Sequence, residues 1–215
     1  MTLAADLGCG IVVPVLEDDD LEVLAFKLDA GPDSICEMGA CLSADERRRA
    51  GAFARERDRN RFVAARGQLR HLLASRLGIP PSEVELEYGP QGKPRLSARM
   101  PGRELRFGVS RSDDVAVFAF SDTREVGVDI EALRPVAEAD DIAALCFSAS
   151  EYESYRDLPP EGRTEGFLRR WTRLEAISKA LGCGLGQPVP SDDGDWSIHT
   201  FVPEPEFIGT AVVQK

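Results

Sequence analysis

Two pairs of side chains in the second half of the sequence have types and spacings suited to catalysis. The segment Val126-Gly-Val-Asp-Ile-Glu131 alternates as a strand does, so Asp129 and Glu131 share one face while Ile130 points to the other. Two carboxylates on one face repel each other unless a cation or a base lies between them, and such hard oxygen ligands suit Mg²⁺. A strand end with solvated acids explains the hexapeptide equally well.

The second pair, Glu175 and Lys179, lies in Trp171-Thr-Arg-Leu-Glu-Ala-Ile-Ser-Lys179. Because the two residues are four positions apart on a predicted helix, their side chains project from one face. A surface ion pair contributing about 0.3–0.5 kcal/mol is the plainer explanation. The chain, however, has four lysines beside 22 arginines, so a lysine here suggests a need for a compact point charge.

An arginine-rich segment lies upstream of these pairs and includes Arg49 and Arg66. Residues 43–70 contain nine arginines and four acids, a net charge of +5 in a chain of −11. Guanidinium groups suit phosphate because they donate several hydrogen bonds in one plane. A solvated helix face with ion pairs is one alternative, and a nucleic acid is a weaker one in so acidic a chain. A compact polyphosphate ligand fits a local basic segment better than a long polymer does.

Two further fragments add side chains that suit phosphate. Lys93 lies in Gly92-Lys-Pro94, a tight turn with a cation at its tip. The strand end Phe107-Gly-Val-Ser-Arg-Ser112 combines small residues with Ser110 and Arg111. A ligand can therefore approach the backbone there and find donors for its phosphate oxygens.

The elements that carry these residues are predicted from periodicity, capping patterns and breakers. Ser43-Ala-Asp-Glu46 and Ser148-Ala-Ser-Glu151 match the capping box that begins a helix. Apolar patterns over 58–77 and 162–181 predict two longer helices, each ended by a glycine. Ser121-Asp-Thr123 is interpreted as a hairpin turn. The predicted strands lie within 11–28, on either side of an acidic turn, and at 84–88, 106–109, 115–120, 126–131, 196–201 and 207–213.

The order of these helices and strands predicts an α+β fold made of two similar halves with mostly antiparallel sheets. We place the N-terminal half at residues 1–103 and the C-terminal half, which carries the carboxylates, at residues 104–215. The sequence has neither a glycine-rich dinucleotide fingerprint after a strand nor a P-loop. Neither a Rossmann nor a P-loop nucleotide site is therefore indicated.

Composition limits the setting of this chemistry. The chain has 215 residues, of which 43% are hydrophobic and 29% charged, as is typical of a soluble globular protein. No apolar run is long enough to span a membrane, and the N-terminus lacks the pattern of a signal peptide. Five cysteines without a CxxC pair, beside two histidines, argue against a zinc site or a disulfide framework. We expect a cytoplasmic protein with no membrane partner.

Taken in order, these fragments resemble the Sfp-type 4′-phosphopantetheinyl transferases. The resemblance covers residues 43 to about 188, and its most specific parts are Gly127-Val-Asp-Ile-Glu131 and the motif from Trp171 to Lys179. It implies a pseudo-dimer of two α+β halves with coenzyme A in the cleft between them. Family members move the phosphopantetheine arm of coenzyme A to a serine of an acyl or peptidyl carrier protein. They release adenosine 3′,5′-bisphosphate and require Mg²⁺.

By position, the resemblance also implies a role for each candidate residue. Asp129, Glu131 and Glu175 are the implied Mg²⁺ ligands, and Glu175 is also the implied base for the carrier serine. Lys179 is expected to neutralise charge on the pyrophosphate. The residues expected to hold the phosphates of coenzyme A are Arg49, Arg66, Lys93, Ser110 and Arg111.

Three positions depart from the family pattern. Gly108 and Arg111 stand where the family has asparagine and histidine, and Leu174 stands where it has a lysine at the rim of the site. These changes leave open an alternative, a non-catalytic or weakly active homologue that binds coenzyme A. The carrier protein is expected to dock on an apolar patch near the cleft that includes Phe147 or Phe167. The internally doubled fold favours a monomer.

Overall fold

The computed structural model describes residues 12–18, 20–183 and 193–215. Predictions that fall on residues 11, 19 and 184–188 lie outside the described residues. The helices are α1 (Pro32–Ala40), α2 (Ala44–Gly51), α3 (Glu56–Leu77), α4 (Ala139–Cys146), α5 (Ala149–Arg156) and α6 (Pro160–Leu181), with short 3₁₀ turns η1 (Pro81–Glu83) and η2 (Asp193–Asp195). The strands are β1 (Val12–Asp18), β2 (Leu21–Lys27), β3 (Leu86–Tyr88), β4 (Pro94–Leu96), β5 (Arg106–Ser112), β6 (Val115–Ser121), β7 (Val126–Ala132), β8 (Trp196–Phe201) and β9 (Phe207–Gln214).

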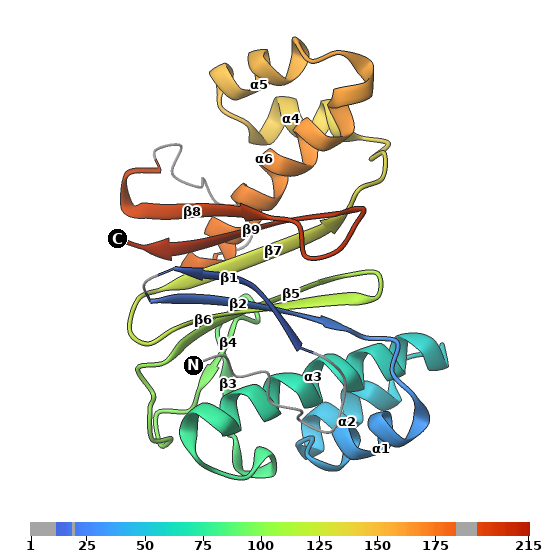
Figure 1. The fold of residues 1–215 in the computed structure, drawn as a ribbon, viewed down its shortest axis with the longest axis vertical. Coiled ribbons are helices and arrows are strands. Elements are labelled where there is room, and N and C mark those ends of the chain that lie inside the picture. The colour runs from blue at the N-terminus through green and yellow to red at the C-terminus, as the bar shows by residue number, and fades with distance from the viewer. Residues whose placement is uncertain (1–11, 19, 184–192) are drawn as a thin grey trace.

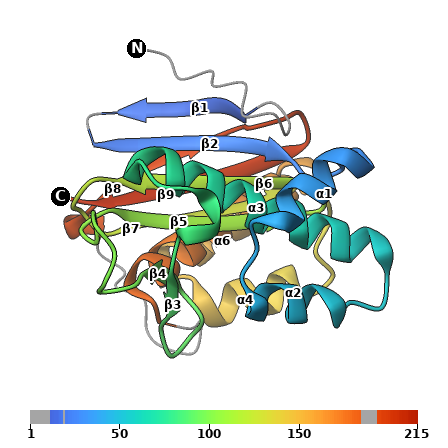
Figure 2. The ribbon, with the colours of Figure 1, turned by 90° about the horizontal axis from the view of Figure 1, so that it is seen from below.

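Two antiparallel sheets lie at the centre of the molecule, with helices on both outer sides (Figure 1). The first sheet has the strand order β1-β2-β6-β5 and the second has β7-β9-β8, while β3 and β4 form a separate hairpin. Helix α3 packs on the first sheet, α1 and α2 pack against α3, and α6 packs on the second sheet. In Figure 2, which shows the molecule from below, α3 lies over the strands of the first sheet.

Strand β6 shows how the layers are held together, because it is buried along its whole length. Phe118 and Phe120 pack against the helices of the N-terminal half. The alternate residues, Val117 and Ala119, pack against the second sheet, where they meet Val128 and its neighbours on β7. Burial of both faces explains why the strand reads as a continuous apolar run rather than as an alternation of apolar and polar residues.

The two halves repeat one local construction. Helices α3 and α6 each have 22 residues, and each ends at a glycine with a φ angle of 67°. A short helix that begins with a complete capping box precedes each of them in the chain. In both halves the glutamate of the capping box pairs with an arginine of the long helix, Glu46 with Arg70 and Glu151 with Arg173. The predicted α+β fold of two similar halves is confirmed.

Two local predictions need correction. The segment Ser121-Asp-Thr123 is not a hairpin turn, because β6 and β7 belong to different sheets and the segment crosses from one sheet to the other. The hairpin of this region lies between β5 and β6, where Asp113 has a positive φ of 48°. The sequence analysis also did not identify α1 and α4, two short helices of nine and eight residues that lack a side-chain N-cap.

The strand pairing bears on how the chain divides into halves. Strands β5 and β6 follow residue 103, yet they pair in the sheet that contains β1 and β2. We propose that the halves meet between β6 and β7, near residues 122–125, rather than at residues 103 and 104. Within the part of the chain that the structure describes, no helix combines the length and apolar character needed to cross a bilayer.

Candidate active site

The candidate site lies where β7, β5 and α6 meet. Ile130 of β7 packs against the first sheet, so Gly127, Asp129 and Glu131 point to the opposite side, that of α6. A Cβ atom at position 127 would overlap the carbonyl oxygen of Ala176 on α6. Glycine at this position therefore lets the strand approach the helix closely, and the following carboxylates come within reach of the helix side chains.

Asp129, Ser110 and Lys179 form a tight polar cluster at this junction. The Lys179 ammonium donates to Asp129 Oδ1 at 2.5 Å and to Ser110 Oγ at 2.9 Å, and the Ser110 hydroxyl donates to the same Oδ1 at 2.8 Å. The Asp129 side chain is 4% exposed. Its second oxygen, Oδ2, is buried and has no hydrogen-bond partner among the described residues. One carboxylate oxygen thus holds a cation, while the other retains its full capacity to accept a ligand.

Glu131 is oriented by Ser112, a residue for which the sequence analysis proposed no role. The Ser112 hydroxyl donates to Glu131 Oε2 at 3.0 Å and accepts from the backbone N–H of Ala132 at 3.1 Å. Two serines of β5 therefore each donate a hydrogen bond to a carboxylate of β7, Ser110 to Asp129 and Ser112 to Glu131. The equal two-residue spacing of serines and carboxylates is visible in the sequence, but it does not show that β5 and β7 lie side by side.

Gly108, one of the departures from the family pattern, lies on β5 beside the backbone of Gly127 and Val128 on β7. A Cβ atom at this position would be 3.3 Å from the Val128 nitrogen and 3.4 Å from the Gly127 Cα. These distances are shorter than ordinary van der Waals contacts. The glycine therefore allows the close approach of β5 and β7 that brings the serines to the carboxylates.

Burial raises the pKa of all three carboxylates of the site, and neighbouring carboxylates add to the rise for Glu131 and Glu175. Burial raises the pKa of Asp129, although its contacts with Lys179 and Ser110 oppose the rise. Burial and then the charge of Asp129 raise the pKa of Glu131. Burial followed by the charges of Asp129 and Glu131 raises the pKa of Glu175, which α6 presents one helical turn before Lys179. A cation between these groups would relieve their repulsion.

The residues present fit a divalent cation in their chemistry. Asp129, Glu131 and Glu175 supply hard oxygen donors, and the partnerless Oδ2 of Asp129 is an acceptor already stripped of water. Across residues 12–18, 20–183 and 193–215, however, no three acidic, histidine or cysteine side chains are already grouped closely enough to hold a metal. The donor set therefore suits Mg²⁺ but is not preassembled for it.

A second cluster, of three arginines, lies on the other side of β5. The guanidinium carbons of Arg49 and Arg111 lie 5.8 and 6.0 Å from the ring centre of Phe62, so the ring lies near both cations. Burial, together with the charges of Arg66 and Arg49, lowers the pKa of Arg111. Like charges gathered in this way favour an anion as a partner. The structure thus brings together three residues that the sequence analysis assigned to phosphates.

Most other arginines of residues 43–70 have acidic partners. Arg48 pairs with Asp45, Arg59 with Glu56, and Arg57 and Arg61 with Asp29, while Arg70 pairs with Glu46. Arg49 and Arg66 instead lie close enough to Arg111 for their charges to act on it, so positive charge gathers at these three residues even though Arg66 also pairs with Glu46. A concentrated charge of this kind matches a compact anion rather than an extended polymer.

Arg66 is oriented from two sides. Its Nε lies 3.3 Å from Oε1 of the buried Glu46, which belongs to the capping box of α2 and pairs with Arg70 through its other oxygen. Its guanidinium also donates to the Tyr88 hydroxyl and lies 5.4 Å from the centre of that ring. Tyr88 was not identified from the sequence, because nothing in a lone tyrosine at a strand end indicates an arginine partner.

Lys93 is the candidate that the structure does not bring into either cluster. Its ammonium donates to Glu125 Oε2 at 2.8 Å and to the backbone carbonyl of Ala180 at 2.6 Å. The phosphate-binding role assigned to Lys93 stays a prediction, and its ammonium lies instead beside the end of α6.

Three apolar side chains differ from their predicted positions. Leu174 is 7% exposed and packs in the core between α4, α5 and α6, so it does not lie on the rim of the site. Phe147 and Phe167 are 8% and 2% exposed, and they pack against Tyr155 in the same core. The prediction of a docking patch containing Phe147 or Phe167 is therefore wrong.

The protein is thus built of two similar α+β halves with a cluster of carboxylates and a lysine along their junction, as in a two-half enzyme. Family models support this class: residues 30–123 match the N-terminal domain of 4′-phosphopantetheinyl transferases, and residues 125–206 match the 4′-phosphopantetheinyl transferase superfamily. The chain is 37% identical to the 4′-phosphopantetheinyl transferase HetI of Nostoc sp., over 92% of this chain and 89% of HetI. It is 31% identical to a 4′-phosphopantetheinyl transferase of Bacillus subtilis, over 85% and 81% of the two chains. The chain therefore belongs to the 4′-phosphopantetheinyl transferase family, a family of transferases.

Proposed function

We propose that this protein transfers the phosphopantetheine arm of coenzyme A to a serine of an acyl or peptidyl carrier protein. The observation that carries the proposal is the arrangement around β5. Ser110 faces the site of Asp129 and Lys179, and its neighbour Arg111 faces the arginine cluster. Two regions whose side chains suit phosphate, one with carboxylates and one without, thus lie one residue apart on β5. Coenzyme A has two such phosphate groups, the pyrophosphate and the 3′-phosphate.

In this proposal the arginine cluster binds the 3′-phosphate. Arg49, Arg66 and Arg111 repel one another in the free protein, and a dianionic phosphate converts that repulsion into charge-assisted hydrogen bonds. Arginine at position 111 keeps the positive charge that histidine provides in the family pattern, and it adds donors. Ser110 is placed to donate to a pyrophosphate oxygen when its bond to Asp129 is exchanged.

Asp129, Glu131 and Glu175 are the residues that would hold Mg²⁺. When bound, the ion would neutralise charge on the pyrophosphate and make the bisphosphate a better leaving group. Lys179 supplies positive charge from the protein itself, because its ammonium already lies at the centre of the site, on Asp129 and Ser110. A compact ammonium on a flexible stem can follow the charge as it moves to the leaving oxygen.

Glu175 is the group that we assign as the base. Before a cation binds, burial and then the charges of Asp129 and Glu131 raise the pKa of Glu175, so its carboxylate takes up a proton more readily than an ordinary glutamate does. The carrier serine loses its proton to Glu175 and forms a bond from Oγ to the phosphorus that bears the pantetheine arm. The bond from that phosphorus to the bridging oxygen breaks, and adenosine 3′,5′-bisphosphate leaves with the electron pair.

The proposal also includes a cellular location and an oligomeric state. None of the cysteines in the described part of the chain forms a disulfide, which fits a reducing compartment and supports a cytoplasmic location. We expect the doubled fold to act as a monomer, because its two halves already form the junction that holds the site.

The direct test is the release of the leaving nucleotide. Purified protein, Mg²⁺, coenzyme A and an apo carrier protein should yield one adenosine 3′,5′-bisphosphate per carrier, measured by chromatography. A carrier whose acceptor serine is replaced by alanine should yield none. Failure to release the nucleotide with fatty-acid, polyketide and peptide carriers alike would overturn the proposal, as would equal release with the alanine carrier.

A further inference from the structure

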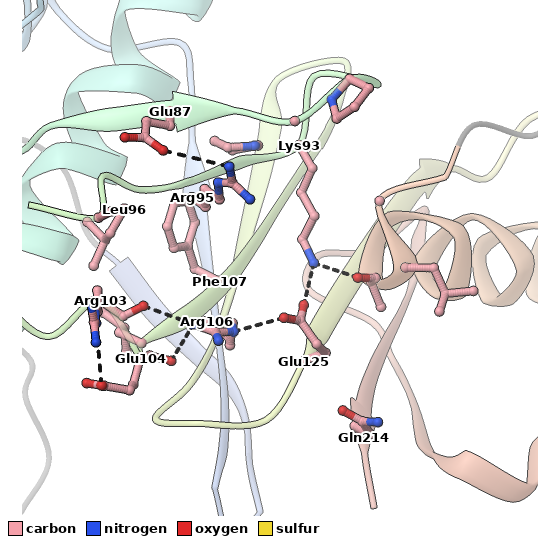
Figure 3. Close-up of a pocket in the computed structure, with 18 of the residues that line it drawn as sticks. Glu87, Lys93, Arg95, Leu96, Arg103, Glu104, Arg106, Phe107, Glu125 and Gln214 are labelled. Atoms are coloured by element: carbon pink, nitrogen blue, oxygen red, sulfur yellow. Dashed lines mark hydrogen bonds and ion pairs between the residues drawn. The ribbon is translucent and has the colours of Figure 1, made fainter.

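The Gly92-Lys-Pro94 turn holds Lys93 rigidly at the junction of the two halves. The N–H of Gly89 donates to the carbonyl of Lys93 at 2.9 Å, and Gly92 has a positive φ of 83°. Glycine is suited to that backbone conformation, and the proline that follows Lys93 fixes the next φ angle. The backbone of the turn is thus fixed before the side chain makes any contact, and the ammonium is directed toward the C-terminal half (Figure 3).

The ammonium meets the last turn of α6, where helix carbonyls lack partners within the helix. The N–H of Gly182 donates to the carbonyls of Ser178 and Lys179, and the N–H of Cys183 donates to that of Ser178. Neither of these two N–H groups donates to the carbonyl of Ala180. Lys93 donates to that carbonyl at 2.6 Å and also brings a positive charge to the negative end of the helix dipole.

The helix end is shaped to receive this side chain. Gly182 has a positive φ of 67°, and a Cβ atom at that position would lie 3.6 Å from Cδ of Lys93. The aliphatic part of the lysine thus lies against the glycine that ends α6, and its ammonium reaches back to the carbonyl. The Lys93 side chain is 23% exposed, so its contacts are partly shielded from water.

Glu125 completes the network at the first residue before β7. Its carboxylate accepts from Lys93 at 2.8 Å and from Arg106 Nε at 2.8 Å, so it joins two cations of the N-terminal half (Figure 3). Its backbone carbonyl accepts from the N–H of Gln214 at 2.9 Å, which attaches it to the second sheet. These contacts line a pocket of about 810 Å³ between the β3–β4 hairpin, β5 and the end of α6.

We propose that Lys93 is a positioning residue that caps α6 from the opposite half and, with Glu125, fixes the helix end that carries Lys179. This inference rests on the proposed transferase function. Lys179 immediately precedes the capped carbonyl of Ala180, and Asp129 follows Glu125 by four residues on β7. Lys179 and Asp129 form the ion pair at the centre of the site. Lys93 therefore joins the end of α6, which carries Lys179, to the start of β7, which carries Asp129. The Gly-Lys-Pro motif acts here on the helix rather than on a phosphate.

Kinetics separate the positioning role from direct phosphate binding. If Lys93 positions α6, Lys93→Ala and Glu125→Gln each lower kcat about fivefold and leave KM for coenzyme A within about twofold. The amide of Glu125→Gln is uncharged and has one acceptor oxygen, so it cannot accept from Lys93 and Arg106 on separate oxygens as the carboxylate does. Lys93→Arg should recover most of kcat, because arginine can donate to the same two acceptors. Arg95→Ala, at an exposed ion pair of the same hairpin, is the matched control and should behave as wild type.

Hydrogen exchange gives a readout that does not need activity. The amides of residues 179–183 should exchange faster in Lys93→Ala and in Glu125→Gln than in wild type or in Arg95→Ala, while the amides in the middle of α6 stay unchanged. A raised KM in Lys93→Ala with wild-type kinetics in Glu125→Gln would overturn the proposal, as would unchanged exchange at residues 179–183. If the wild-type protein transfers nothing, the proposed function fails, while the exchange experiment still decides whether Lys93 caps α6.

Discussion

Among single residues, Glu175 is the one on which the proposed chemistry depends most directly. Before a cation binds, burial and two neighbouring carboxylates raise its pKa. Glu175→Gln keeps the shape of the side chain and removes the proton acceptor. We expect transfer to fall at least about 100-fold, with binding of coenzyme A largely retained, as measured by initial rates and by calorimetry.

The control for this change is Glu165→Gln on the same helix. Glu165 pairs with Arg169 at an exposed site, so its loss should leave the rate unchanged. Near-normal transfer by Glu175→Gln would exclude Glu175 as the base.

Arg111 tests the arginine cluster as the binding region for the 3′-phosphate. Arg111→Ala should weaken binding of coenzyme A about tenfold or more, because a charge-assisted hydrogen bond is lost. Binding of dephospho-coenzyme A, which lacks the 3′-phosphate, should change much less. Calorimetry with both compounds measures the difference.

Arg48→Ala, at an exposed pair with Asp45 on α2, is the matched control and should bind both compounds as wild type does. An equal loss of affinity for the two compounds in Arg111→Ala would place the 3′-phosphate elsewhere.

Among the elements, the contact between β7 and α6 sets the geometry of the carboxylate site. In Gly127→Ala the new Cβ would overlap the Ala176 carbonyl oxygen and lie 2.7 Å from the Ala180 nitrogen. Overpacking of this kind costs about 1–3 kcal/mol of the free energy of unfolding. The strand and helix must separate, so we expect lower stability in denaturant titrations and a larger loss of transfer.

Gly51→Ala gives the opposite expectation for the same substitution. Gly51 lies in α2, and no atom lies within 4 Å of the Cβ position there. Alanine should therefore raise stability by up to about 1 kcal/mol. Equal stability of the two variants would show that β7 and α6 are not in close contact.

The elements also show what the sequence predicted and why. Helices α2 and α5 were located at their first residue, because Ser43 and Ser148 bring their capping boxes within four residues. A signal of this kind can be recognised from the sequence alone, because all of its residues are neighbours in the chain. The crossing at Ser121 was misread as a hairpin, because a turn sequence does not show whether the next strand joins the same sheet or stacks on it.

The candidate site likewise has features that the sequence predicts and contacts that it does not. The shared face of Asp129 and Glu131 and that of Glu175 and Lys179 follow from strand and helix periods. The contacts of Ser112 with Glu131 and of Lys93 with α6 join segments from different halves, and only packing brings them together.

At the scale of the whole molecule, Asp20 joins the first sheet to the segment that crosses into the second. Its carboxylate accepts from the Ser121 hydroxyl at 2.7 Å, from the N–H of Asp122 at 2.8 Å and from Arg124 at 3.1 Å. Partial burial raises the pKa of Asp20, but the hydrogen bonds and the charge of Arg124 together lower it by more, so the net pKa lies below its ordinary value. The stabilisation is therefore present above that ordinary value and is lost as pH falls through the folded-state pKa.

Asp20→Asn tests this connection between the halves. At neutral pH the variant should be less stable than wild type by up to about 1 kcal/mol, since the site is partly exposed. The difference should shrink as the pH falls below about 4, because the wild-type carboxylate is then protonated. Thermal unfolding across this range measures the effect, and a difference that stays constant with pH would contradict it.

The central claim, that the junction of the two halves transfers phosphopantetheine, is tested most directly by intact-mass spectrometry of a carrier protein. An apo carrier incubated with this protein, coenzyme A and Mg²⁺ should gain the mass of one phosphopantetheine arm. The gain should disappear with EDTA and return with added Mg²⁺. No gain on any of several carriers, while calorimetry shows that coenzyme A binds, would contradict the account.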